Sequence, residues 1–356
     1  MEIIIETTPQ FALTIKDIED LPIELAQYAA IYRDLFGRRE QKEHYKTYLE
    51  GLMLDVPNKS VETMMLNLKG DDPNAIRSMQ HFLSEGSWQD QAILQRHWQE
   101  VSHDVGDENG VLIGDGSGFP KQGRESVAVK RQWCGQLGKI ANCQVGVFLG
   151  YASQHGRTLL NRRLYLPQEW VEDDSYAEQR RKCGVPEKIT FKTKPALLLE
   201  MVEELQAAGS LPFRWLTCDE EFGRDTTFLD QVGNYVWYLA EVDHDTRIWL
   251  TRPQAVVPDW SGQGRRPTRE RLVGGEPEAQ EVSGLAASLP ANRWERHTIK
   301  EGSKGTLVAD FAALRVVTVR DGLPGPTVWL VLRRNPGTGE VKYYLSNAPA
   351  ETPLDT

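Results

Sequence analysis

The chain has 356 residues, a formal net charge of −10 at pH 7, 40% hydrophobic residues and 26% charged residues. Its length allows about two or three domains with separate cores, and its composition is that of an ordinary globular protein. No apolar stretch is long enough to span a membrane, and the N-terminus has neither a basic leader nor a cleavage site. We therefore expect a cytoplasmic protein without a membrane partner.

Several chemistries lack their usual motifs. The four cysteines form no CxxC pair and have no closely spaced histidine, which predicts free buried thiols and no zinc site. No GxxxxGK[ST] loop occurs, so ATP use is not expected. His155, His244 and His297 have no serine or cysteine partner in an elbow-like motif, which argues against nucleophile chemistry.

Residues 1–105 are predicted to form a helical domain. Apolar spacing predicts helices within 24–37, 39–54, 60–70, 72–86 and 87–101, several of which begin at a capping residue or end at glycine. Arg38, Arg39, Lys42 and Lys46 form a basic stripe along one of these helices. The stripe is a candidate DNA phosphate contact, and the alternative is an ordinary solvated helix face.

Residues 106–242 are predicted to form an α/β core. An apolar run at 111–115 ends in Asp115, strands at 144–152 and 158–167 are joined by a turn at 154–156, and a periodic helix covers 194–209. A second apolar run, 213–219, ends in Asp219 and is followed by a short helix at 225–233 and a strand at 235–242. The order is strand, hairpin, helix, strand, helix, strand.

Residues 243–347 are predicted to form a β-rich insertion with a basic, exposed loop at 260–275. In residues 348–356, Thr352-Pro353 is typical of a helix start.

Two aspartates at strand ends suggest a metal site. Carboxylates on a rigid sheet can bind a pair of divalent ions, which activate water or a 3′-hydroxyl at a phosphodiester. The alternative is that Asp115 and Asp219 only cap following segments. Gly116, Gly118 and Gly123 would let a ligand approach the backbone after Asp115. Nearby candidate DNA contacts are Lys121, Arg124, Lys130 and Arg131, whose alternative is a polar turn with solvated charges.

The blocks DGSGFPKQG, VAVKRQWCGQLGKIANCQVGVFLGYAS, LLNRRLYLP, RRKCGVPE, FKTKPALLLEMV and FRWLTCDEEFGRD resemble the DDE transposases of bacterial insertion sequences. The similarity covers most of the chain and is strongest to the IS-seven-hundred-one group, related to the IS-four group. It implies a ribonuclease H-like mixed-sheet core in which Asp115 and Asp219 are the first and second catalytic and metal-binding acids. It also implies Mg²⁺ or Mn²⁺ as cofactor, double-stranded DNA as partner (terminal inverted repeats and target), a homodimer in the DNA complex and association with the nucleoid.

The sequence departs from this family in one respect. The family's third acid is a glutamate on a helix after the insertion, and no matching block occurs in this chain. Glu220 and Glu221 are interpreted as helix N-terminal charges, and Glu241, Glu295, Glu301 and Glu340 lie in no matching context. We therefore expect a C-terminally truncated transposase, or one completed by frameshifting, that binds metal weakly and cleaves DNA poorly.

Two alternatives remain open from the sequence. The chain is an inert transposase remnant that only binds DNA, or another metal-dependent phosphodiesterase with the same core. Arg162-Arg163, Arg180-Arg181-Lys182 and Arg265-Arg266 are further candidate phosphate contacts, with a solvated surface as the alternative.

Overall fold

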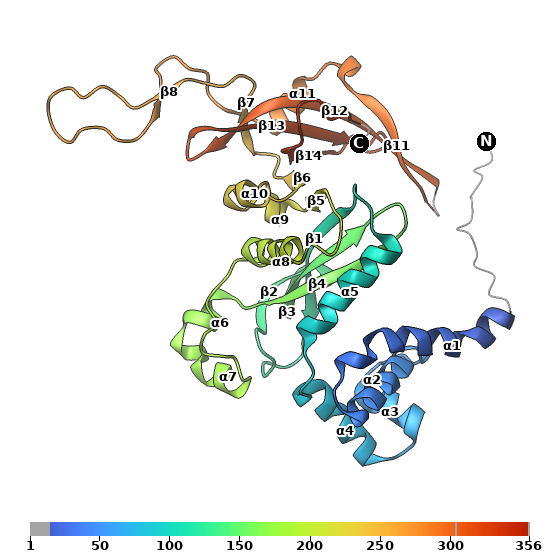
Figure 1. Cartoon of the computed structure of the whole chain (residues 1–356). Coiled ribbons are helices and arrows are strands. Elements are labelled where there is room, and N and C mark those ends of the chain that lie inside the picture. The colour runs from blue at the N-terminus through green and yellow to red at the C-terminus, as the bar shows by residue number, and fades with distance from the viewer. Residues whose placement is uncertain (1–14, 303–304, 355–356) are drawn as a thin grey trace. The chain divides into compact units, whose positions relative to one another are not determined.

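The computed structural model describes residues 15–302 and 305–354. Contacts divide these residues into two units. The boundary along the chain falls between Glu100 and Val101, within one helix. The first unit is helical, and the second contains a large mixed sheet with helices (Figure 1).

The described residues of the helical unit form helices whose ends mostly follow the signals in the sequence. They are α1 (Ile15–Tyr32), continued by the short 3-10 helix η1 (Arg33–Leu35), α2 (Arg39–Leu52), α3 (Val61–Lys69), α4 (Pro73–Glu85) and α5 (Asp90–Val105). The Ser60 hydroxyl accepts a hydrogen bond from the Thr63 amide at 3.1 Å, and α3 ends at Gly70 with a φ of +74°. The Asp72 carboxylate likewise caps α4. The predicted caps are confirmed.

An aromatic and methionine-rich cluster holds the helical unit together. Its buried members are Tyr32, Phe36, Met64, Met65, Met79 and Phe82. Removing such side chains from water stabilises a core by about 1.5–3 kcal/mol each. The unit therefore has a core of its own, contributed by α1 to α4.

The second unit is built on a twelve-stranded sheet. Its first part contains β1 (Val111–Pro120), β2 (Lys130–Cys134), β3 (Lys139–Ala152), β4 (Arg157–Tyr165), β5 (Trp215–Cys218) and β6 (Trp237–Val242). β3 lies between β1 and β4 and is antiparallel to both, whereas β5 is parallel to β1 and β6 is parallel to β5. The predicted order of strand, hairpin, helix, strand, helix and strand is observed, with the β3–β4 turn closed by a Ser153-to-Gly156 backbone hydrogen bond.

Two details of this sheet differ from the prediction. β1 does not end at Asp115 but continues to Pro120, because β3 pairs with it along its whole length. Asp115 instead lies where the pairing of β1 with β5 ends, at Gly114. β2 was not predicted, because its charged and aromatic residues are partly exposed and give no clear apolar alternation.

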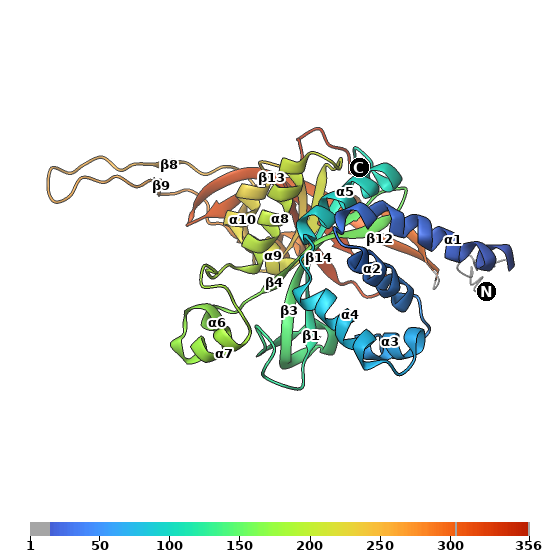
Figure 2. The ribbon, with the colours of Figure 1, turned by 60° about the horizontal axis from the view of Figure 1, so that its bottom comes forward.

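Three helices cover one face of the core strands (Figure 1 and Figure 2). They are α8 (Lys194–Ala208), α9 (Glu220–Gly223) and α10 (Thr226–Val232). α8 begins at Thr193, whose hydroxyl accepts from the Ala196 amide, and ends at Gly209 with a φ of +59°. A Cβ at Gly114 would lie 2.3 Å from Leu198 Cδ2, so glycine in β1 is what lets α8 approach the sheet. The smaller elements between β2 and α8 are η2 (Gly135–Leu137), α6 (Gln168–Glu172), η3 (Asp174–Tyr176) and α7 (Ala177–Lys182).

The predicted β-rich insertion continues the core sheet. Its elements are β7 (Arg247–Trp249), β8 (Ala255–Val256), β9 (Arg271–Leu272), β10 (Gln280–Glu281), α11 (Val282–Ser288), η4 (Ala291–Arg293), β11 (Glu295–Gly302), β12 (Gly305–Arg320), β13 (Leu323–Arg334) and β14 (Val341–Ser346). β14 pairs antiparallel with β6, and β13, β12 and β7 follow in order. β8 and β9 form a separate two-stranded sheet.

Two further predictions concern termini and thiols. Thr352 and Pro353 lie in a segment that contains turns, and no helix begins there among the residues described up to 354. The four cysteines are free as predicted, and Cys134, Cys143 and Cys218 are buried.

In the described part of the chain no helix is both long enough and apolar enough to cross a membrane.

The contact between α9 and β6 gives a test of this packing. A Cβ at Gly223 would lie 1.9 Å from the carbonyl oxygen of Glu241, a backbone atom that cannot move independently. We expect Gly223→Ala to lower the free energy of unfolding by about 1–3 kcal/mol, as overpacking does. Denaturant unfolding measures this. Gly284→Ala is the control, because nothing lies within 4 Å of a Cβ there and the change should be neutral or stabilising. Equal effects of the two substitutions would contradict the close packing.

Candidate functional site

The pairing of β1 with β5 brings the two predicted aspartates together. Gly114 and Cys218 are register partners in these parallel strands, and Asp115 and Asp219 are the next residue of each chain segment. Neighbouring strands lie about 4.8 Å apart. Because Gly114 faces α8 and side chains alternate, Asp115 points to the opposite face of the sheet. Residues 104 positions apart in sequence (219 − 115) thus become neighbours.

Both carboxylates are accessible to solvent, and each retains acceptor capacity. Asp115 Oδ1 accepts from the Gly116 amide at 2.7 Å. Asp219 Oδ1 accepts from the Glu221 amide at 3.1 Å, so Asp219 does cap α9, as the alternative interpretation proposed. One carboxylate offers about four lone-pair sites, and capping uses one of them. Capping therefore leaves Asp219 able to bind a cation.

The two carboxylates affect each other's charge. The pKa of Asp219 is raised above its ordinary value, first by partial desolvation and then by the negative charge of Asp115, with smaller contributions from Glu221 and Glu220. Such a pair is electrostatically unfavourable without a counter-charge. Two hard oxygen donors next to each other match the ligand preference of Mg²⁺ and Mn²⁺.

Glu221 has a neighbour that the sequence did not suggest. It lies in the first turn of α9, as predicted, but its Oε1 also pairs with Lys194 Nζ at 2.5 Å. Its Oε2 lies 3.6 Å from the Cβ position of Gly116, which places it beside β1 on the α8 face. Lys194 thus ties the start of α8 to the start of α9, directly behind the aspartate pair. Its position just after the cap Thr193 was the only sequence signal for this role.

The other acids of the second half have partners or lie elsewhere. Glu241 pairs with Lys342 at 2.7 Å, and Glu295 lies 3.8 Å from His297. Glu340 is exposed, and the side chain of Glu301 lies outside the described residues. Within residues 15–302 and 305–354, no group of three or more His, Cys, Asp or Glu side chains is arranged to hold a metal ion.

The basic residues after Asp115 are separated by the structure. Lys121 and Arg124 lie in an exposed loop that is held to β3 by Asn142, whose amide donates to the carbonyls of Lys121 and Gly123 at 2.8 Å. Lys130 forms an ion pair with Glu169 and is half-buried. Arg131 is the neighbouring residue of β2 and is exposed. Lys121, Arg124 and Arg131 are therefore the more accessible candidates for DNA contact.

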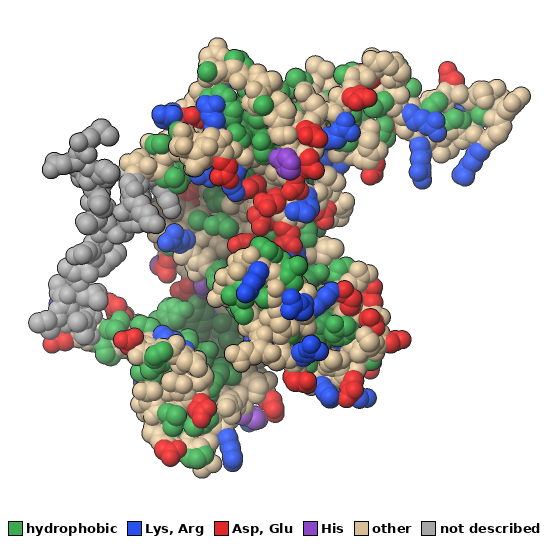
Figure 3. Space-filling model, turned by 180° about the vertical axis from the view of Figure 1, so that it is seen from behind, with side chains coloured by type: hydrophobic (Ala, Val, Ile, Leu, Met, Phe, Trp, Pro, Cys, Tyr) green, Lys and Arg blue, Asp and Glu red, His purple; other side chains and the backbone are tan. Residues whose placement is uncertain are grey.

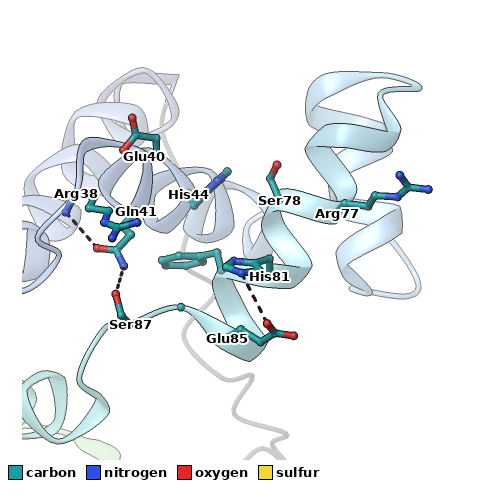
Figure 4. Close-up of a pocket in the computed structure, with 11 residues that line it drawn as sticks. Arg38, Glu40, Gln41, His44, Arg77, Ser78, His81, Glu85 and Ser87 are labelled. Atoms are coloured by element: carbon teal, nitrogen blue, oxygen red, sulfur yellow. Dashed lines mark hydrogen bonds and ion pairs between the residues drawn. The ribbon is translucent and has the colours of Figure 1, made fainter.

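The candidate basic stripe lies at the start of α2. Arg38 is the N-cap residue, Arg39 and Lys42 follow in the first turn, and Lys46 lies 3.7 Å from Glu50. Arg38 also lines a pocket of about 710 Å³ between α2 and α4, together with His44, Arg77 and His81. Figure 4 shows Gln41 of α2 donating a hydrogen bond to the Ser87 hydroxyl in the loop that follows α4. The pocket is a mixture of charges, because Glu40 and Glu85 also line it.

A hollow of about 650 Å³ lies on the sheet face that Asp115 shares. Val111, Trp215, Thr217 and Leu239 line it from the core strands. The insertion contributes Phe311, Trp329 and Val331, and Leu354 lies at its edge. This part of the sheet face is therefore largely apolar, whereas the opposite face is covered by α8 to α10.

Comparison with known proteins identifies the family of this chain. A sequence model of the family described as DDE superfamily endonuclease matches residues 32–306, more than three quarters of the 356 residues. The chain belongs to the DDE superfamily of endonucleases. Its resemblance to that family, inferred above from sequence blocks, is confirmed.

Two individual proteins are similar to this DDE superfamily member. The probable transposase for insertion sequence element IS701 of Microchaete diplosiphon is 24% identical over 317 residues, which cover 87% of this chain and 72% of that protein. The NurA nuclease of Sulfolobus solfataricus shows 10% identity over 74% of this chain and 77% of its own, with a TM-score of 0.27. A score of that size does not establish a shared fold.

The raised pKa of Asp219 predicts a pH-dependent effect of its removal. The folded protein binds a proton at Asp219 more readily than the unfolded chain does. The ionised Asp219 carboxylate therefore destabilises the fold at a pH above its raised pKa, and this destabilisation is lost as the pH falls through that pKa. In chelator at pH 7 we expect Asp219→Asn to raise the melting temperature, since asparagine keeps the helix cap and removes the repulsion. The gain should disappear near pH ~4, where Asp219 approaches its ordinary protonation range.

Asp219→Ala is the matched control for the cap. It removes the repulsion and also the hydrogen bond to the Glu221 amide, a loss of about 0.5–2 kcal/mol. Alanine should therefore be less stable than asparagine at every pH. If asparagine lowers the melting temperature at pH 7, the two carboxylates do not repel each other as inferred.

Proposed function

We propose that this chain is a DDE transposase that cleaves DNA at the ends of an insertion sequence and transfers the freed strand to target DNA. The observation that carries this proposal is the register of β1 and β5, which makes Asp115 and Asp219 neighbours. The family match and the similarity to a probable insertion-sequence transposase support the substrate class. Double-stranded DNA, as terminal inverted repeats and target, is the proposed partner.

The proposed core fold is ribonuclease H-like. Supporting this, the core strands follow the spatial order β4-β3-β1-β5-β6, with β3 antiparallel to its neighbours and β5 and β6 parallel to β1. We propose the domain organisation on the same basis, with a helical domain at 1–105, a catalytic core at 106–242 and an insertion at 243–347. The insertion differs from a separate domain in that β14 joins the core sheet at β6.

Asp115 and Asp219 are the proposed metal ligands, with Mg²⁺ or Mn²⁺ as the ion. A bound divalent ion supplies charge neutralisation and activation of a water or hydroxyl nucleophile at a phosphodiester. Asp115 offers oxygen ligands from the rigid centre of the sheet. Asp219 offers its remaining lone pairs from the N-terminus of α9, where the cap hydrogen bond fixes the carboxylate. Lys194 neutralises Glu221 behind the site and so limits the total negative charge beside the aspartates.

DNA contact is proposed for the accessible basic residues of both units. In the second unit these are Lys121, Arg124 and Arg131, and Lys130 would have to exchange its ion pair with Glu169. In the helical unit they are Arg38, Arg39, Lys42 and Lys46. Contacts of this type neutralise phosphates and position DNA without reading its sequence.

Metal-dependent nicking tests the proposal. Purified protein is incubated with Mn²⁺ and DNA carrying terminal inverted repeats, and nicked product is measured over time. Nicking is expected to be slow, because the described residues supply two carboxylates and no third ligand group. Asp115→Asn and Asp219→Asn should each reduce it to the level seen in chelator.

Asp225→Asn is the matched control. Asp225 caps α10 through the Phe228 amide at 3.0 Å, so the same chemical change is made at another helix cap six residues away from Asp219 (225 − 219). It should leave both nicking and Mn²⁺ binding unchanged. If the wild type binds DNA but neither nicks it nor binds Mn²⁺ through Asp115 and Asp219, the chain is an inert DNA-binding protein and the enzymatic proposal fails.

A further inference from the structure

A two-stranded arm projects from the insertion and makes no part of the large sheet. It comprises residues 254–273, in which β8 and β9 pair antiparallel through Ala255 with Leu272 and Val256 with Arg271. The Val273 amide donates to the Gln254 carbonyl at 3.0 Å and closes its base. Figure 1 and Figure 2 both show the arm extending away from the strands of the insertion.

The arm is anchored at its base and shaped at its tip. Arg252 donates to the carbonyls of Pro324 and Gly325 in β13, which fixes the point where the arm leaves the sheet. At the tip, Gly262 and Gly264 have φ values of +85° and +74°, a conformation that favours glycine. The Trp260 indole donates to the Gly264 carbonyl at 3.2 Å across this turn. The tip therefore has a specific turn geometry.

The charge of the arm is opposite to that of the chain. The arm contains four arginines, Arg265, Arg266, Arg269 and Arg271, and two acids, Asp259 and Glu270. The whole chain, in contrast, has a net charge of −10. All four arginines are exposed, and none of them forms an ion pair with the residues that the structure describes. Basic side chains stand out from the tip in Figure 3. The arm thus carries a net charge of +2 (four arginines minus two acids), and its arginines form no ion pair among the described residues.

The arm also exposes apolar surface that a lone hairpin cannot bury. Val256 and Trp260 are each 51% exposed, and Val257, Leu272 and Val273 are exposed too. An isolated pair of strands is at best marginally stable in water, and exposed apolar residues rimmed by charge are typical of interaction surfaces. A partner that meets both the apolar strands and the arginines would order the arm.

We propose that the arm binds double-stranded DNA by placing its two strands along a groove, with Arg265, Arg266 and Arg269 on the flanking phosphates. This inference rests on the proposed function, since DNA is the substrate there. A two-stranded β ribbon fits the major groove of B-DNA, which is about 12 Å wide. Guanidinium groups are well suited to phosphate oxygens, because they donate two parallel hydrogen bonds and stay charged. Seven consecutive residues, 265–271, extend at most about 25 Å, enough to reach several phosphates.

The test compares DNA binding of the full chain with that of an arm variant, Arg265→Ala/Arg266→Ala/Arg269→Ala. Fluorescence anisotropy with a labelled duplex of roughly four helical turns is measured in chelator at several salt concentrations between about 0.05 and 0.2 M. Each lost phosphate contact lowers the slope of log K against log salt by about 0.9, so the slope should fall by about 2.7. Affinity at about 0.1 M salt should fall at least tenfold.

The matched control is the triple lysine variant, Arg265→Lys/Arg266→Lys/Arg269→Lys. It keeps the charge, so its salt slope should match the wild type. Melting temperatures should be unchanged in both variants, because the substituted side chains are exposed and unpaired.

Three outcomes would overturn the inference, and they are distinguishable. Wild-type affinity and slope in the alanine variant would remove the arm from DNA binding and leave the proposed function standing. No duplex binding by the wild type would remove both. A change of oligomeric state in the alanine variant by sedimentation, without loss of DNA binding, would make the arm a contact between copies of the chain.

Discussion

The parallel pairing of β1 with β5 is the constraint on which the candidate site depends. It fixes Gly114 opposite Cys218, so that Asp115 and Asp219, the next residue of each segment, are neighbours. A slip of one residue would turn one carboxylate toward α8, because side chains alternate along a strand. Gly114 helps to fix this arrangement, since any Cβ there would collide with Leu198 of α8. The packing of α8 on Gly114 and the orientation of Asp115 therefore depend on each other.

The insertion stabilises the core by extending it. β6 would otherwise be an edge strand with unpaired backbone groups, and β14 pairs with it along Tyr343 to Ser346. The close approach of Gly223 to Glu241 on the same strand locks α9 onto this part of the sheet. As a result Asp219, at the start of α9, is held by strands from both the core and the insertion. The position of the second acid thus depends on residues more than a hundred positions downstream.

The distribution of charge explains how an acidic chain can belong to a family of DNA-cleaving enzymes. Several basic residues of the core are used internally, as in Lys130 with Glu169, Arg163 with Glu204 and Lys342 with Glu241. These pairs are partly exposed, contribute little to stability and remove net positive charge from the surface. Accessible positive charge remains on the loop after β1, on Arg131 of β2, at the start of α2 and on the arm of residues 254–273. Net charge alone therefore gives a poor indication of DNA binding in this protein.

The sequence by itself determined most of the elements and their order, and it indicated Asp115 and Asp219 as the candidate acids. Caps such as Ser60 and Asp72 and glycine stops are local signals, and local hydrogen bonds fixed them as predicted. The tertiary structure alone decided the extent of β1, the union of the insertion with the core sheet and the pairing of Lys194 with Glu221. These features depend on contacts between segments far apart in the chain. No local pattern encodes such contacts, because strand pairing and ion pairing are set by which surfaces pack together.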